Sequence, residues 1–153
     1  MKIRKAELKD WEKIVEFFKK TTEFEQTVNE KISLDGVSEE YFKADIAKEI
    51  LLSDYLYLIA EVEEKAVGFI SGYLRTNSWW TYKKNAYIDH VFVEEEFRGK
   101  GIGKKLFEKF EKWAKKNKAD LLTIEVLPEN TDAIEIYKKL GFSDHLLHLK
   151  KEI

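Results

Sequence analysis

The sequence has 153 residues, of which 44% are hydrophobic and 37% charged, and its 27 Lys and Arg nearly balance its 29 Asp and Glu. This length suits a single domain over residues 1–153, and the near-neutral charge disfavours a protein that binds nucleic acid through its phosphates. The absence of cysteine excludes disulfides, thiolate metal sites and a cysteine nucleophile, and without a signal-like or membrane-length apolar run we expect a cytoplasmic protein that does not enter membranes.

The first third of the chain predicts one strand and two helices. A short strand covers residues 3–6, and Asp10 caps a helix whose apolar side runs from Trp11 to Phe18. Residues 21–37 have weak periodicity and are expected to be irregular. Ser38, followed by two glutamates in the first turn, is expected to start a second helix that reaches Ile50.

The middle of the chain predicts three consecutive strands. Residues 55–60 and 66–73 are expected to form a hairpin around the polar connection 63–65. An aromatic loop over residues 78–85 leads into the next strand, residues 87–93. These strands are expected to pair mostly in antiparallel fashion.

The last third predicts a helix, a strand, a second helix and a final strand. Residues 101–117 carry apolar side chains on one helical stripe, residues 121–126 read as a buried strand, and residues 130–140 form a helix that Gly141 ends. Residues 145–153 can form a last strand. Because a helix joins the strands at 87–93 and 121–126, we expect that pair to be parallel and the fold to be a mixed α/β sheet with helices on both faces.

The turn between the strand at 87–93 and the following helix is rich in glycine. Three glycines within five residues allow backbone amides to converge, and the start of a helix adds unpaired N–H groups and a positive dipole end. The sequence therefore predicts a pyrophosphate site, whose residues are Arg98, Gly99, Lys100, Gly101, Ile102, Gly103 and Lys104. The alternative is a tight structural turn with solvated lysines. Neither the dinucleotide fingerprint nor the P-loop pattern is met, since Lys105 stands where a P-loop needs Ser or Thr.

Residues 91–103 resemble the acyl-CoA signature of the GNAT superfamily of N-acetyltransferases. That signature is Arg/Gln-x-x-Gly-x-Gly/Ala after an apolar strand, and Arg98, Gly101 and Gly103 match it. Downstream, Asn130 and Tyr137 resemble the second half of the family pattern, together with Ala133 and residues 140–142. The resemblance implies the GNAT fold, acetyl-CoA as co-substrate, and direct transfer of the acetyl group to a primary amine.

The resemblance also implies roles for individual residues. The pantetheine arm of acetyl-CoA would add to the strand edge formed by the backbone of Val91, Phe92 and Val93, and the Val93 amide would stabilise the oxyanion. Asn130 would contact the cofactor arm, although Asn is equally a favoured helix N-cap. Tyr137 would be the general acid that protonates the leaving thiolate, although an aromatic residue on an amphipathic helix is often only part of the core.

Glu125 is the candidate general base, because it interrupts the apolar stretch at 121–127. Partial burial would raise its pKa toward a range useful for accepting an ammonium proton, and the alternative is a structural carboxylate paired with a lysine. Asp89 and His90 are further candidates that are expected to point to opposite faces of their strand. No metal site is predicted from the spacing of His145 and His148.

The acceptor is not identified by the sequence. Trp79, Trp80 and Tyr82 suit a substrate wall or, equally, a dimer contact, and the acidic residues around the first two helices suit a cationic acceptor or merely a solvated face. Small-molecule amines and peptide N-termini both remain open, with a homodimer as one possible assembly. The rival functions are an acyl-CoA-binding module without catalysis and a nucleotide-phosphate binder that uses the same loop.

Overall fold

The computed structural model describes residues 1–33, 39–76, 78, 80–151 and 153. Its centre is a five-stranded sheet in the order β1-β2-β3-β4-β5, in which neighbouring strands pair in antiparallel fashion except for the parallel pair β4–β5. The strands are β1 (Lys2–Lys5), β2 (Tyr55–Val62), β3 (Lys65–Thr76), β4 (Lys84–Val93) and β5 (Leu121–Ile124).

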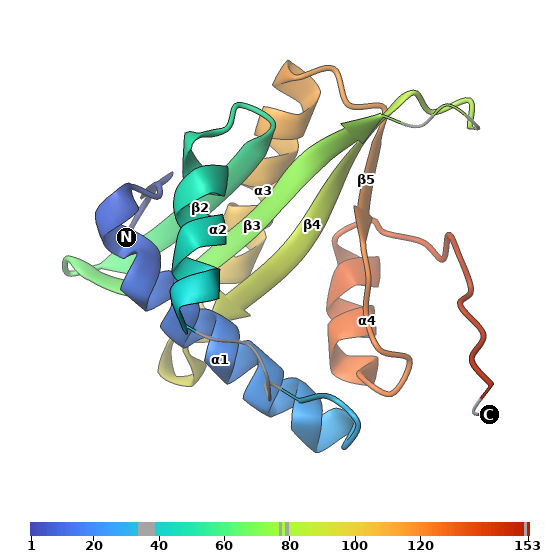
Figure 1. Ribbon diagram of the computed structural model, residues 1–153, viewed down its shortest axis with the longest axis horizontal. Helices are drawn as coiled ribbons and strands as arrows, with labels where there is room; N and C mark the ends of the chain where they lie inside the picture. Colours follow the sequence, from blue (N-terminus) through green and yellow to red (C-terminus); the bar gives the residue numbers. More distant parts are fainter. Residues whose placement is uncertain (34–38, 77, 79, 152) are drawn as a thin grey trace.

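Helices cover both faces of the sheet (Figure 1). Helices α1 (Trp11–Val28) and α2 (Glu39–Leu51) lie on one face, and α3 (Ile102–Lys116) and α4 (Thr131–Lys139) pack on the other. The predicted mixed α/β fold with helices on both faces is therefore confirmed.

Each face has its own apolar core. On the α1/α2 face, Phe17 lies between Phe69 of β3 and Phe92 of β4, with ring centroids 5.7 and 5.3 Å away. On the α3/α4 face, Leu106 and Phe110 are fully buried against the sheet. They belong to the predicted stripe of α3, whose apolar residues recur every four positions and so face one side of the helix.

Helix α1 is longer than the sequence pattern predicts. Residues 21–28 are helical, so the expectation of an irregular segment was wrong there, whereas residues 34–37 and the expected cap at Ser38 lie outside the described residues. The hydroxyls of Thr21 and Thr22 donate hydrogen bonds to the carbonyls of Phe17 and Phe18, at 2.9 and 3.2 Å. These bonds satisfy two polar side chains within the helix.

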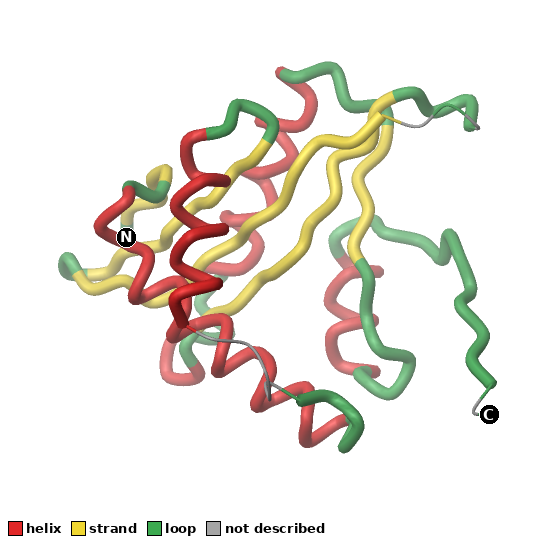
Figure 2. Tube along the Cα trace, viewed as in Figure 1, coloured by secondary structure: helices red, strands yellow, loops and turns green. Residues whose placement is uncertain are grey.

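The expected C-terminal strand is not formed. Residues 143–151 have no regular secondary structure and extend away from the sheet after α4 (Figure 2). Leu146, Leu147 and Leu149 are 62, 81 and 86% exposed. A strand needs a neighbouring strand to share its hydrogen bonds, and within the described chain this segment does not pair with the outer edge of β5.

Candidate active site

Strands β4 and β5 are joined firmly at one end only. The Asp120 carboxylate accepts hydrogen bonds from the backbone N–H groups of Lys83 and Lys84, at 2.9 and 3.0 Å, and Asn85 Nδ2 donates to Thr123 Oγ1 at 2.9 Å. Pairing then continues only to Ile88 and Ile124. Beyond this point the strands diverge (Figure 1), which leaves residues 89–93 without a strand partner on the β5 side among the described residues. We call this divergence the splay.

The backbone of β4 at the splay has a defined orientation. The N–H group of Glu94 donates to the carbonyl of Val67 at 2.9 Å, which makes Val93 and Gly68 a non-hydrogen-bonded antiparallel pair. The N–H and C=O groups of Val93 therefore point away from β3 and toward the splay. By alternation the same holds for Val91, whereas the backbone of Phe92 faces β3. Two of the three predicted backbone positions thus direct their polar backbone groups toward the splay.

The predicted glycine turn lies directly beyond this edge. Arg98 Nε donates to the Val93 carbonyl at 2.9 Å, and the Lys100 ammonium donates to the Glu96 carbonyl at 2.8 Å. Gly99 and Gly101 have φ values of 72° and 78°, a region that disfavours other residues. Gly101 is the N-cap of α3 and its first turn has no side-chain cap.

The side chains of the remaining turn residues are either buried in the core or exposed to solvent. Ile102 is buried in the α3-face core, so only its backbone is available to a ligand. A Cβ on Gly103 would lie 4.0 Å from Cγ2 of Val93, which places the start of α3 against the end of β4. Lys104 is exposed. The first turn of α3, which has no side-chain cap, thus lies against the end of β4 in an arrangement suited to an anion.

Tyr137 lies on α4 and is half-buried. Its ring packs against Phe107 and Phe142, with centroids 5.7 and 6.0 Å apart. Burial, followed by the negative charge of Glu25, raises the pKa of the Tyr137 hydroxyl to about 12. The phenol is therefore protonated at neutral pH, as a general acid requires.

Asn130 is the N-cap of α4, because its Oδ1 accepts a hydrogen bond from the Ala133 N–H at 3.2 Å. The capping interpretation is confirmed, and this bond fixes the start of the helix that carries Tyr137. Contact between Asn130 and a cofactor arm remains a prediction.

Glu125 is exposed, so the expectation of partial burial was wrong. It follows directly after β5, at the edge of the sheet, where few side chains cover it. Burial raises the pKa of the nearby Tyr87 hydroxyl, and the negative charge of Glu125 raises it further. Leu122 and Ile124 of β5 pack in the α3-face core, so alternation along the strand directs Glu125 to the α1/α2 face, where the Tyr87 ring contacts that of Tyr73 at 5.3 Å.

Asp89 and His90 share one face of β4, in contrast to the expected opposite faces. Ser71 pairs with His90 whereas Gly72 pairs with Ile88, so Asp89 is an extra residue in a β-bulge. The bulge turns both side chains to the α1/α2 face, where His90 Nε2 lies 3.2 Å from the Asp89 carboxylate and the His90 ring contacts Phe18 edge-on at 4.5 Å. Glycine is required at position 72, since a Cβ there would lie 2.1 Å from the Tyr87 carbonyl oxygen.

Two further carboxylates lie near this face: Glu25, one of the acidic residues that the sequence places around the first two helices, and Glu49, which the sequence did not indicate. Glu49 of α2 accepts a hydrogen bond from the Tyr57 hydroxyl, and burial raises the pKa of Glu49. Burial also raises the pKa of Glu25, against the opposing influence of His90. Glu25 is seven residues after Phe18, which is two helical turns, so extending the first predicted helix by two turns would have placed it on this face.

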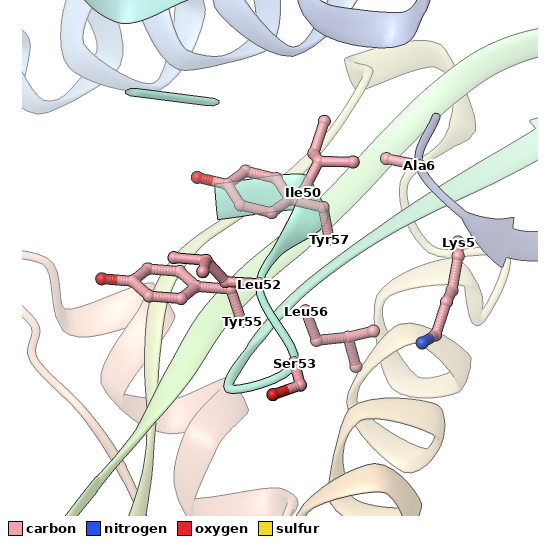
Figure 3. Close-up of a pocket in the computed structure, with 8 residues that line it drawn as sticks. All are labelled: Lys5, Ala6, Ile50, Leu52, Ser53, Tyr55, Leu56 and Tyr57. Atoms are coloured by element: carbon pink, nitrogen blue, oxygen red, sulfur yellow. The ribbon is translucent and has the colours of Figure 1, made fainter. Parts of the chain in front are cut away.

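The aromatic loop lies at the opposite end of β4 from the glycine turn. Trp80 and Tyr82 are exposed, and the Trp80 ring lies 5.1 Å from that of His145, so this loop meets the C-terminal segment. Trp79 lies outside the described residues. A small cavity of about 50 Å³ lies elsewhere, between the α2–β2 connection and the end of β1, where the Tyr55 and Tyr57 side chains point the same way (Figure 3).

Residues 11–142 match the family model described as the acetyltransferase (GNAT) family. An uncharacterized N-acetyltransferase of Methanocaldococcus jannaschii is 38% identical over 88 residues, which are 58% of this chain but only 39% of that protein. The thialysine N-epsilon-acetyltransferase of Bos taurus is 28% identical over 93% of this chain and 84% of its own length.

A solved aminoglycoside N-acetyltransferase, in complex with the bisubstrate analogue CoA-S-monomethyl-acetylneamine, has a similar fold. Its TM-score is 0.77 at 18% identity, over 99% of this chain and 98% of that one. In the described part of this chain, none of the helices has both the length and the apolarity that a membrane crossing needs.

Proposed function

We propose that this chain, which belongs to the acetyltransferase (GNAT) family, transfers an acetyl group from acetyl-CoA to a small primary amine by direct attack of the amine. The observation that carries the proposal is the unpaired edge of β4, where the polar backbone groups of Val91 and Val93 face the splay. A pantetheine arm contains amides that can add to such an edge as a strand does. The glycine turn lies at the end of this edge, where the pyrophosphate would follow.

Acetyl-CoA supplies an activated thioester. The N–H group of Val93 donates to the oxyanion as the neutral amine forms its C–N bond. The Glu125 carboxylate supplies this neutral amine by accepting a proton from its ammonium form, directly or through water, and later releases it to solvent. The second proton, which the nitrogen loses once the C–N bond has formed, passes to solvent. The Tyr137 hydroxyl gives its proton to the sulfur as the C–S bond breaks, and the tyrosinate is then reprotonated from solvent. The products are the acetylated amine and free CoA thiol.

The names of the relatives support a small amine as acceptor. Thialysine and aminoglycoside acetyltransferases act on amines of small molecules, and one relative, from Sulfurisphaera tokodaii, is an N-alpha-acetyltransferase. A peptide N-terminus is therefore the second acceptor class to test. The carboxylates on the α1/α2 face next to the splay favour a small cationic amine.

The test combines acetyl-CoA with a panel of aliphatic amines, aminoglycosides and peptides, and follows both thiol release and thermal stability. We expect stabilisation by acetyl-CoA and thiol release that requires an amine. Stabilisation without thiol release for any acceptor would instead identify an acyl-CoA-binding module. Stabilisation by ATP but not by acetyl-CoA would identify a nucleotide-phosphate binder.

A further inference from the structure

The two edges of the sheet differ in how well they are protected from pairing with another strand. β1 forms one edge, and three of its four residues are basic: Lys2, Arg4 and Lys5. The Lys109 ammonium also donates a hydrogen bond to the Ile3 carbonyl. Charged residues on a short edge strand keep other chains from adding to it. β5 forms the opposite edge, and its four residues carry no charge, so this edge lacks the same protection.

The outer side of β5 directs polar backbone groups away from the sheet. The N–H group of Asp120 donates to the Lys84 carbonyl at 2.8 Å, so the backbone of Asp120 faces β4. By alternation the backbone of Leu122 also faces β4, whereas the N–H and C=O groups of Leu121 and Thr123 point outward. Within the described chain, β5 has no strand on that side. An added strand would find its hydrogen-bond partners at these two residues.

The C-terminal segment, residues 143–151, is held at its start and directed away from the sheet. The Lys138 ammonium lies 3.5 Å from the Asp144 carboxylate, and the ring of His145 contacts that of Trp80. Beyond these contacts the segment leaves the body of the protein (Figure 2). Its start therefore directs it away from β5 of its own chain.

The apolar pattern of this segment matches that of β5. Leu147 and Leu149 are 81 and 86% exposed, and their spacing places them on one side of an extended chain. Leu122 and Ile124 have the same spacing and pack in the α3-face core. An antiparallel strand with Leu147 opposite Ile124 also has Leu149 opposite Leu122. In this register both exposed leucines would extend that core.

The same register is complementary in charge. It sets Lys151 opposite Asp120 and so brings opposite charges together across the two strands. Lys150 comes opposite Leu121, so no like charges oppose each other along β5. A strand that matches the edge in backbone, apolar side chains and charge is thus present in every copy of the chain.

We propose that two copies of this chain form a dimer by strand exchange, in which residues 143–151 of each copy pair in antiparallel fashion with the outer edge of β5 of the other. Because each copy carries both halves of the interface, the exchange closes with two-fold symmetry and covers both β5 edges. The added strand would end opposite Glu125, so each copy would border the candidate active site of the other. The dimer does not depend on the proposed function.

Sedimentation of the full chain over a range of concentrations measures the assembly. We expect a dimeric wild type, and a dissociation constant that rises about tenfold or more in Leu147→Glu and in His148→Pro. The proline removes an N–H group that the register pairs with Thr123. Leu51→Glu, at a leucine of α2 that is 72% exposed, is the matched control and should dimerise as the wild type does. A monomeric wild type, or a dimer that neither substitution weakens, would overturn the inference.

Disulfide cross-linking tests the register. The chain contains no cysteine, so a mixed disulfide between Ile124→Cys and Leu147→Cys proteins can form only between copies. We expect this mixed product on oxidation, and none when Leu51→Cys replaces Leu147→Cys. Its absence would contradict the exchange, as would a doubly substituted chain that closes the disulfide within one copy. Neither measurement uses catalysis, so a failure of acetyl transfer would leave the result unaffected.

Discussion

The carboxylate of Asp89 lies 3.2 Å from Nε2 of His90, although the two residues are neighbours on one strand. The bulge places Asp89 and His90 on the α1/α2 face, where Glu125 also lies, whereas Tyr137 packs with the core of the opposite face. Groups that can take a proton from the amine and the phenol that can give one to the sulfur are therefore on opposite faces of the sheet. The two faces of the sheet are connected at the splay, where β4 and β5 separate.

Replacement of Tyr137 by Phe should lower kcat by about a hundredfold and leave the KM for acetyl-CoA nearly unchanged, because only the proton for the leaving thiolate is lost. Steady-state kinetics with thiol detection measure this. Tyr82→Phe, at an exposed tyrosine of the aromatic loop, should behave as the wild type. A Tyr137→Phe enzyme with unchanged kcat would show that Tyr137 is only a packing residue.

Glu125→Gln should lower kcat/KM for the amine by about a hundredfold at neutral pH. The deficit should shrink as the pH rises toward the pKa of the amine, since an already neutral amine needs no base to accept its proton. A pH profile of both enzymes tests this, with Glu129→Gln as the exposed control. A deficit that is constant across pH would contradict the base assignment and direct attention to Asp89 and His90.

Substitution of two glycines of the turn by alanine should have different effects: one lowers the stability of the fold and the other weakens cofactor binding. Gly101→Ala forces a Cβ into a left-handed conformation, at φ 78°, and should cost about 1–2 kcal/mol of stability. Gly103→Ala lies inside the first turn of α3 and should preserve stability, because its Cβ would only touch Val93. Its Kd for acetyl-CoA should nevertheless rise, since the Cβ narrows the approach to the amides. Thermal unfolding and calorimetry measure the two effects; unchanged affinity in Gly103→Ala would argue against the phosphate site.

Glu25→Gln should stabilise the unliganded protein at neutral pH, by up to about 0.5 kcal/mol. The raised pKa of Glu25 means that its charged form is disfavoured in the folded state. This cost is full above the folded-state pKa and disappears below the ordinary glutamate value, about 4.3. The advantage of the variant should therefore fade as the pH drops toward 4 in denaturant titrations. A Glu25→Gln protein less stable than the wild type at pH 7 would reveal a structural partner for the carboxylate.

Local sequence patterns predicted the parts of the site that depend on local structure. The glycine turn, the stripe of α3 and the cap at Asn130 are each encoded within a few residues, and all three were placed correctly. The orientation of Asp89 and His90 was not, because the bulge exists only through the pairing of β4 with β3. The full extent of α1, and with it the position of Glu25, depends on packing against the sheet. The C-terminal strand was wrongly expected, and within the described chain the outer edge of β5 has no strand partner.

The most direct test follows an isotope-labelled acetyl group from acetyl-CoA by mass spectrometry, with the panel of aliphatic amines, aminoglycosides and peptides as acceptors. We predict that the label appears on an amine nitrogen, with one free CoA thiol released for each acetylated amine. Thiol release without labelled amine, or no turnover of bound acetyl-CoA with any amine, would contradict the account.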